Sequence, residues 1–305
     1  MKTLGLIALF LSVTTHAFVD WARLKNPVYQ HEAWSVKDAT MIYREETGEF
    51  YVFFSAFFES RGKIASHISG VKTKDFVTFS EPLFVWSGEE IGYKGLAAPE
   101  VMRDGDRFVM SYNSWGDKLL KPNHLFYATS PDLEHWEKHQ PLAGNISRWQ
   151  RLIDATLAKR NNQYVLVYKT GKLFQKSQIA VATDLKGPWK TLGRPIKDWM
   201  ENGELIGLDG VLHLLMTGKG HLPYLSRLNS SDYLSWGPLT RLDVPRETFN
   251  TFDLANAAHL KDWRKYDGYF YLIYAGTTEG DSYLGRGDNR LGIARSTDLI
   301  HWEVP

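Results

Sequence analysis

A short motif that returns five times constrains this chain more than any other feature of its sequence. Each copy has an Asp, then an apolar residue, and then an aromatic residue four or five positions after the Asp. Ser, Thr and Asp side chains bind turn amides, so each copy predicts a tight turn that leads into an aromatic core residue. The copies lie at intervals of 57, 52, 48 and 66 residues, at Asp75, Asp132, Asp184, Asp232 and Asp298.

A strand pattern precedes every copy of the motif. These runs are rich in aromatic and β-branched residues, which favour strands, and four of the five follow Gly, Asp or Asn turns. No segment shows a long apolar period of 3.6 residues, so we expect little helix. The runs occupy 50–54, 108–112, 164–168, 211–215 and 269–274.

Five such units, each with room for four short strands, predict an all-β fold, namely a five-bladed β-propeller. A pair of β-sandwiches is the alternative, which a repeat this regular disfavours. No linker or low-complexity segment interrupts the chain, so we expect one domain over 18–305. Because the last motif ends close to Pro305, blade five lacks room for a full outer strand. We therefore expect segment 18–29 to pack on blade five and close the ring.

The first residues have the pattern of a secretory signal peptide over 1–17. Lys2 is followed by an apolar run over 4–13, and residues 15–17 have the small-x-small form of a cleavage site. The run is too short for a membrane span, which needs about 20 residues. We expect the mature chain to have no membrane span and to be secreted or periplasmic.

The charge balance and the lack of cysteine exclude several classes of function. Lys and Arg total 36 against 35 Asp and Glu, so the basic surface that nucleic-acid binding requires is not expected. With no cysteine, disulfides, thiolate nucleophiles and Cys-based zinc sites are excluded. No required cofactor is indicated, and the sequence leaves the oligomeric state open.

Carboxylates near the start of the predicted innermost strands are the strongest functional signal. Acidic residues are depleted in strands and avoid burial unless paired, so a channel lined by them is costly for a scaffold. Turn-opening residues or a metal site are the alternative readings. Two carboxyl groups in an aromatic groove suit cleavage of a glycosidic bond, which needs an acid and a base or nucleophile. The residues are Asp38, Glu100, Asp154 and Glu201, with His259 in the fifth blade.

These segments resemble the five-bladed propeller glycoside hydrolases of families 43 and 62 over essentially the whole mature chain. The resemblance is carried by 37–40, 98–101, 153–154, 201–203 and 258–259. It implies that Asp38 is the general base, that Asp154 tunes and orients the acid, and that Glu201 is the general acid of an inverting reaction. By the same resemblance, His259 lies near the channel axis, where a structural Ca²⁺ is possible in some members.

The chain departs from that family's pattern at several positions. Ala39 and Ala155 stand where the family has Pro after each Asp, and Asn202-Gly203 replaces a small-Pro pair. Glu204 competes with Glu201 for the role of acid, although we expect the two to face opposite sides of the strand. The identity of the sugar and the exo or endo mode stay open.

We expect a carbohydrate substrate from a plant or algal polysaccharide, cleaved by an arabinofuranosidase-like or xylosidase-like enzyme. An enzyme of another specificity, such as an anhydrogalactosidase-like one, and a catalytically inactive carbohydrate-binding propeller are the alternatives. A protein-interaction scaffold would leave the channel carboxylates unexplained. The expected substrate-binding residues are Trp34, Phe57, Glu100, Trp115, Glu204, His259 and Arg290.

Overall fold

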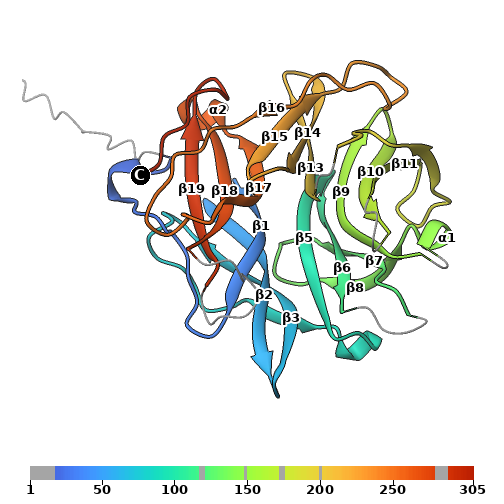
Figure 1. Cartoon of the computed structure of the whole chain (residues 1–305), viewed down its shortest axis with the longest axis horizontal. Coiled ribbons are helices and arrows are strands. Elements are labelled where there is room, and N and C mark those ends of the chain that lie inside the picture. The colour runs from blue at the N-terminus through green and yellow to red at the C-terminus, as the bar shows by residue number, and fades with distance from the viewer. Residues whose placement is uncertain (1–17, 117–120, 148–149, 172–175, 199–200, 279–287) are drawn as a thin grey trace, which may run out of the picture.

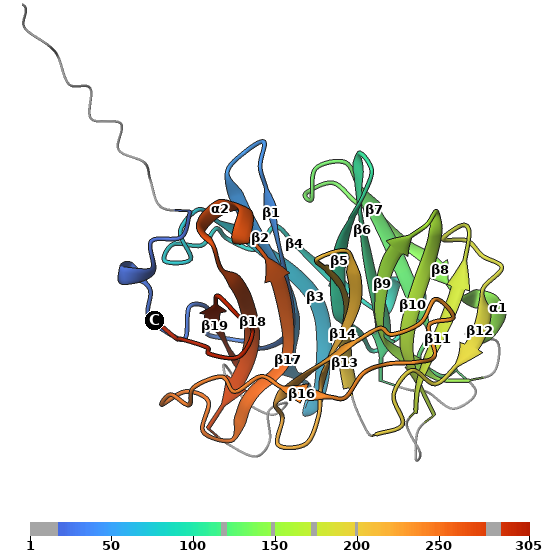
Figure 2. The same cartoon turned by 90° about the horizontal axis from the view of Figure 1, so that it is seen from above.

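The computed structural model describes residues 18–116, 121–147, 150–171, 176–198, 201–278 and 288–305. In these residues, five small antiparallel sheets stand in a ring (Figures 1 and 2). The expected all-β, five-bladed propeller is confirmed. None of the described helices is long and apolar enough to cross a membrane. The expected signal peptide, 1–17, lies outside the described residues.

Each blade is a meander whose first strand lies innermost (Figure 1). Four sheets have four strands, and the last has three among the described residues. Blade one comprises β1 (Ser35–Arg44), β2 (Glu49–Ser60), β3 (Lys63–Thr73) and β4 (Phe84–Ser87); blade two comprises β5 (Gly95–Asp104), β6 (Arg107–Trp115), β7 (Leu125–Ser130) and β8 (Glu137–Leu142). Blade three comprises β9 (Leu152–Arg160), β10 (Gln163–Thr170), β11 (Lys176–Ala182) and β12 (Lys190–Gly193); blade four comprises β13 (Glu201–Leu208), β14 (Val211–Thr217), β15 (Pro223–Arg227) and β16 (Thr240–Arg241). Blade five comprises β17 (Asp253–Asp262), β18 (Phe270–Thr277) and β19 (Arg290–Ser296).

The helices are single turns outside the sheets. They are the 3₁₀-helices η1 (Trp21–Arg23) and η2 (Glu89–Ile91) and the α-helices α1 (Gly144–Ser147) and α2 (Arg264–Asp267).

The repeated motif forms the turn that follows the third strand of a blade. In blade two, Asp132 Oδ1 accepts the backbone N–H groups of Glu134 at 3.0 Å and His135 at 2.8 Å. Leu133, which lies between Asp132 and Glu134, has a φ of 71° and is fully buried. The Trp136 indole N–H then donates to the carbonyl of Leu133 at 3.0 Å. The Asp therefore satisfies the turn amides while two apolar side chains turn inward.

The hydrophobic core is divided among the five junctions between blades. One cluster joins Phe54 of blade one to Ile293 of blade five, and another joins Phe53 to Tyr112 between blades one and two. Three further clusters fill the remaining junctions in the same way. Since both faces of every sheet pack against a neighbour, the strands are apolar in near-continuous runs, as the sequence shows.

Every innermost strand carries a bulge at the same place. The pairing register with the second strand shifts there in all five blades. The residue at the bulge has a left-handed backbone, with φ between 48° and 54°, which costs a non-glycine residue about 1 kcal/mol or more. A bulge re-aims the side chains around it, and here it does so near the axis of the ring. These residues are Asp38, Ala98, Asp154, Asn202 and Ala257.

The N-terminal segment closes the ring, as expected. It covers the outer edge of β19, and in both views it lies beside the C-terminus (Figures 1 and 2). Tyr29 exchanges two backbone hydrogen bonds with Leu291, and Glu303 does the same with Arg295. Between these two backbone pairs, the side-chain amide of Asn26 makes the two hydrogen bonds that a residue of a neighbouring strand would make. Its Nδ2 donates to the carbonyl of Ile293 and its Oδ1 accepts the N–H of Ile293, both at 2.9 Å.

We predict that Asn26→Ala strongly destabilises the protein. Both backbone groups of the buried Ile293 lose their partner, which costs about 2 to 4 kcal/mol, or about 5 to 10 °C in Tm for a domain of this size. Differential scanning calorimetry measures the change. Lys25→Ala, at the exposed neighbouring position, is the matched control. An Asn26→Ala protein that melts within a degree of the control would contradict this account of closure.

Candidate active site

A pocket of about 150 Å³ opens at the N-terminal ends of the innermost strands. Its wall comes from blades one to four, from the bulged residues and from the ends of the neighbouring second strands. The lining includes three asparagines, two aromatic residues, three acidic side chains and three basic side chains. The charged residues are Lys37, Asp38, Arg151, Asp154, Lys169 and Glu201.

Asp38 is the most tightly held carboxylate of the pocket. Its side chain is buried, Oδ2 accepts the Ser55 hydroxyl at 2.7 Å, and Oδ1 accepts Asn202 Nδ2 at 2.9 Å. Lys37 Nζ lies 3.9 Å from Oδ1. Burial raises the pKa of Asp38 above its ordinary value, and the Lys37 charge and the Ser55 hydrogen bond partly offset this. Asp38 is therefore oriented from two sides and is a stronger base than an exposed aspartate.

Asp154 and Glu201 share one cation. Lys169, on β10, places Nζ 2.9 Å from Asp154 Oδ2 and 3.0 Å from Glu201 Oε2. Only 4% of the lysine is exposed. The two carboxylates come from blades three and four, so this ion pair crosses a blade junction close to the axis.

Phe57 and Trp115 also line the pocket, whereas Trp34 and Arg290 do not. The rings of Phe57 and Trp115 pack edge to face with centroids 5.7 Å apart. Trp34 instead stacks on His31 and contacts the edge of His67. Arg290 opens β19 opposite Gly276. Of these four expected substrate-binding residues, the structure thus brings Phe57 and Trp115 to the carboxylates and leaves Trp34 and Arg290 outside the pocket.

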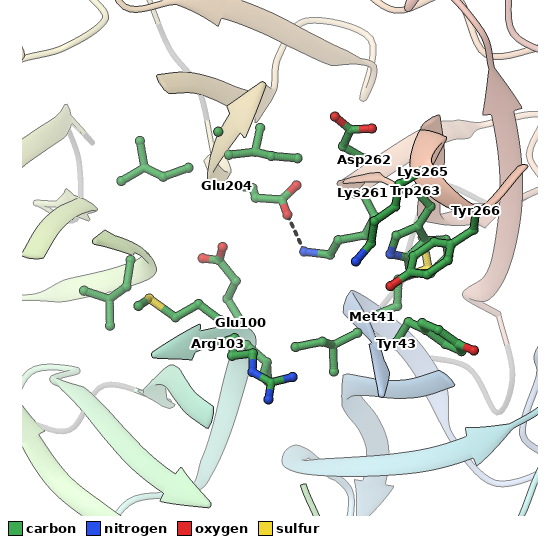
Figure 3. A pocket seen from close by; sticks show the side chains of 17 residues that line it. Met41, Tyr43, Glu100, Arg103, Glu204, Lys261, Asp262, Trp263, Lys265 and Tyr266 are labelled. Atoms are coloured by element: carbon green, nitrogen blue, oxygen red, sulfur yellow. Dashed lines mark hydrogen bonds and ion pairs between the residues drawn. The ribbon is translucent and has the colours of Figure 1, made fainter. Parts of the chain in front are cut away.

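Glu100 and Glu204 lie further along their strands, toward the opposite end of the channel. There they line a larger pocket of about 340 Å³ (Figure 3). Glu204 is engaged, because Oε1 accepts Lys261 Nζ at 2.6 Å and Oε2 accepts the N–H of Leu260. Burial, together with the charge of Glu204, raises the pKa of Glu100 well above its ordinary value. The larger pocket therefore offers one paired carboxylate and one carboxyl group with a raised pKa. The smaller pocket collects three carboxylates from three blades and is the better candidate site.

His259 lies between the two pockets. It lines a small central cavity with Asp38, Glu100 and Asp154, and its Nδ1 is buried without a hydrogen-bond partner. Burial lowers its pKa, which favours the neutral ring. Ca²⁺ prefers about six to eight oxygen ligands. Across the described ranges, no three His, Asp or Glu side chains converge as a metal site. These residues do not fit a Ca²⁺ ion, and we assign it no part in the chemistry.

The sequence reasoning gave no role to several residues of the pocket, among them Lys37, Lys169 and Asn202. Lys37 and Asn202 directly adjoin carboxylates that the sequence had singled out. Lys169 belongs to the second strand of its blade, β10, whose pattern is mainly apolar. A charged residue inside the run from Tyr164 to Thr170 was the available signal, since lysine is rarely buried without a partner.

Comparisons with known proteins support the fold. A scan against protein-family models gives no match, and a search of curated proteins gives none either. Solved structures do match. A glycosyl hydrolase from Bacteroides ovatus is 18% identical, with a TM-score of 0.64 over 88% of this chain and 85% of the other. An α-L-arabinofuranosidase from Lactobacillus brevis is 13% identical, with a TM-score of 0.67 over 92% and 96%.

A family 117 glycoside hydrolase of the marine bacterium Zobellia galactanivorans is 11% identical, with a TM-score of 0.62 over 89% of this chain and 86% of the other. At these identities the likeness shows a shared fold. The resemblance to five-bladed propeller glycoside hydrolases is thus confirmed at the level of the fold.

Proposed function

We propose that this chain is a glycoside hydrolase that acts on a plant or algal polysaccharide or its oligosaccharides outside the cytoplasm. The observation that carries the proposal is the convergence of Asp38, Asp154 and Glu201, from three different blades, on one pocket. A binding module has no need of buried carboxylates there, because desolvating them costs stability. Glycoside hydrolysis requires two carboxyl groups on opposite sides of the scissile bond. The matching solved structures, which are named glycoside hydrolases, add support.

In this proposal Asp38 is the general base. Its fixed carboxylate accepts a proton from a water molecule, and that water attacks the anomeric carbon as the bond to the leaving oxygen breaks. Burial and the raised pKa suit this role, since a base is more effective when its pKa approaches the working pH. The donors Ser55 and Asn202 keep its two oxygens in place during the attack.

Glu201 is the general acid, and Asp154 orients it through their shared lysine. The Glu201 proton passes to the leaving oxygen, so that the departing sugar leaves as a neutral alcohol. Because the water and the acid act on opposite faces, the reaction inverts the anomeric carbon. Trp115, packed edge to face against the buried Phe57, offers apolar surface for a sugar ring.

The choice of sugar is tested by a panel of substrates. We expect the purified protein to release reducing sugar from at least one of arabinan, xylan and agar oligosaccharides. Asp38→Asn and Glu201→Gln keep the side-chain shapes and should each lower kcat by at least about 100-fold on that substrate. If the wild type is inactive on an extended panel but binds a glycan, the inactive-propeller alternative holds. Variants as active as the wild type would remove these residues from catalysis.

We also predict that Asn202→Asp shifts the acid limb of the kcat/KM profile to higher pH by about one unit or more. The substitution replaces a donor to Asp38 with a like charge, which raises the pKa of the Asp38 carboxyl further. The backbone tolerates the change, because Asp38 and Asp154 adopt the same left-handed conformation.

Asn202→Ala is the control for that experiment. It removes the donor without adding charge, and Ala98 and Ala257 show that alanine fits this backbone. Its limb should move in the same direction but less. If the acid limb of the kcat/KM profile lies at the wild-type pH in both variants, the limb does not report the ionisation of Asp38.

A further inference from the structure

We propose that Lys169 positions the general acid and stabilises the negative charge that Glu201 acquires when it gives up its proton. This inference rests on the proposed function and adds to it a residue that the sequence pattern did not single out.

In blades one, two and four, the residue at the position that corresponds to Lys169 binds the bulge of the next blade. On each second strand, one residue pairs with the residue just before the bulge. In blades one, two and four this residue is Ser55, Asn113 or Thr217. Its side-chain oxygen accepts the N–H of the bulged residue of the next blade, at 2.7, 2.9 and 2.8 Å. A polar acceptor here joins one blade to the next.

Lys169 breaks this pattern at the junction of blades three and four. An ammonium group has three donors and no acceptor, so it cannot accept the N–H of the bulged Asn202. Departures from a locally consistent pattern are expected at functional or strained sites. Blade five also departs, with Ala275 at this position, but Ala275 brings no charge. The departure at Lys169 places a cation at the junction that supplies Asp154 and Glu201.

The contacts of Lys169 keep its charge. Burial alone would lower its pKa, but Asp154 and Glu201 outweigh that effect, and the pKa of Lys169 is raised above its ordinary value. With 4% of the residue exposed, the ammonium group has little freedom to leave the two carboxyl groups. It therefore acts as a fixed positive charge and gives up no proton in the reaction.

A fixed cation at this place acts on the transition state. As the C–O bond breaks, the O–H bond of Glu201 breaks and a new O–H bond forms on the leaving oxygen. Glu201 is left with a full negative charge, 3.0 Å from Lys169 Nζ in the structure. That attraction is weaker while Glu201 carries its proton, so it lowers the barrier to proton donation rather than merely strengthening binding.

A purely structural lysine and a positioning lysine differ in their dependence on the leaving group. We test this with two aryl glycosides of the sugar released in the panel, one with phenol and one with 2,4-dinitrophenol as leaving group. Dinitrophenolate departs without a proton, so it needs no help from Glu201. Lys169→Met should lower kcat on the phenyl glycoside by about 100-fold and on the dinitrophenyl glycoside by less than about fivefold. Glu201→Gln should show the same contrast, and Asp38→Asn should lose both activities.

Three further variants distinguish the role of Lys169 from a folding defect. Lys169→Arg keeps a cation that can bridge two carboxylates and should recover much of the phenyl activity, whereas the neutral Lys169→Gln should not. Lys159→Met removes a lysine of the same blade that lies outside the pocket, where its Nζ pairs with Asp104 Oδ1 at 2.6 Å. This variant should leave both rates unchanged. Tm values are measured for all variants.

The outcomes separate the two proposals. Equal losses on both glycosides, or none on either, would overturn the role of Lys169 while the hydrolase proposal stands. If the wild type cleaves no glycoside at all, the proposed function fails and the role of Lys169 fails with it.

Discussion

A hydrogen bond from the backbone N–H of a bulged residue to a side chain of the preceding blade recurs at three of the five blade junctions. The bulged residue has a left-handed backbone and lies on an innermost strand, and the side chain that binds it belongs to the second strand of the blade before it. Such a backbone is strained for non-glycine residues and persists only where the surroundings hold it. Once it is held, the residues at and beside the bulge are aimed at the channel mouth. Asp154 is one of the residues held in this way. Asp38 lies at the bulge of β1 and Glu201 beside that of β13, and the three carboxylates line one pocket.

Bringing carboxylates together carries an electrostatic cost, and the pocket offsets it in two ways. Asp38 receives hydrogen bonds from Ser55 and Asn202, whereas Asp154 and Glu201 share Lys169. Burial raises the pKa of Asp38, the proposed base, although Lys37 lies 3.9 Å away and partly offsets the effect. A cation at 3.0 Å accompanies Glu201, which in the proposed reaction ends as an anion. At the opposite end of the channel, Glu204 pairs with Lys261 (Figure 3).

The sequence predicted the fold because its motif is repeated, and it singled out three carboxylates that the structure brings to one pocket. The motif around Asp132 is local, so its turn could be inferred from a few residues, and the five copies then required a ring. Lys169 and Asn202 depend on contacts between residues 32 and 164 positions apart, which no local pattern reveals. The place of Trp34 also depends partly on distant contacts: it packs against His31, His67 and the core cluster between blades one and five, away from the pocket.

The central claim is that water, activated by Asp38, attacks from the face opposite to Glu201. The configuration of the first sugar released tests this most directly. Proton NMR, recorded within the first minutes of hydrolysis of the cleaved oligosaccharide, distinguishes the two anomers before they interconvert. The account predicts that the first product has the anomeric configuration opposite to that of the bond cleaved. A first product with the original configuration would contradict it, because retention requires a carboxylate that attacks the sugar itself.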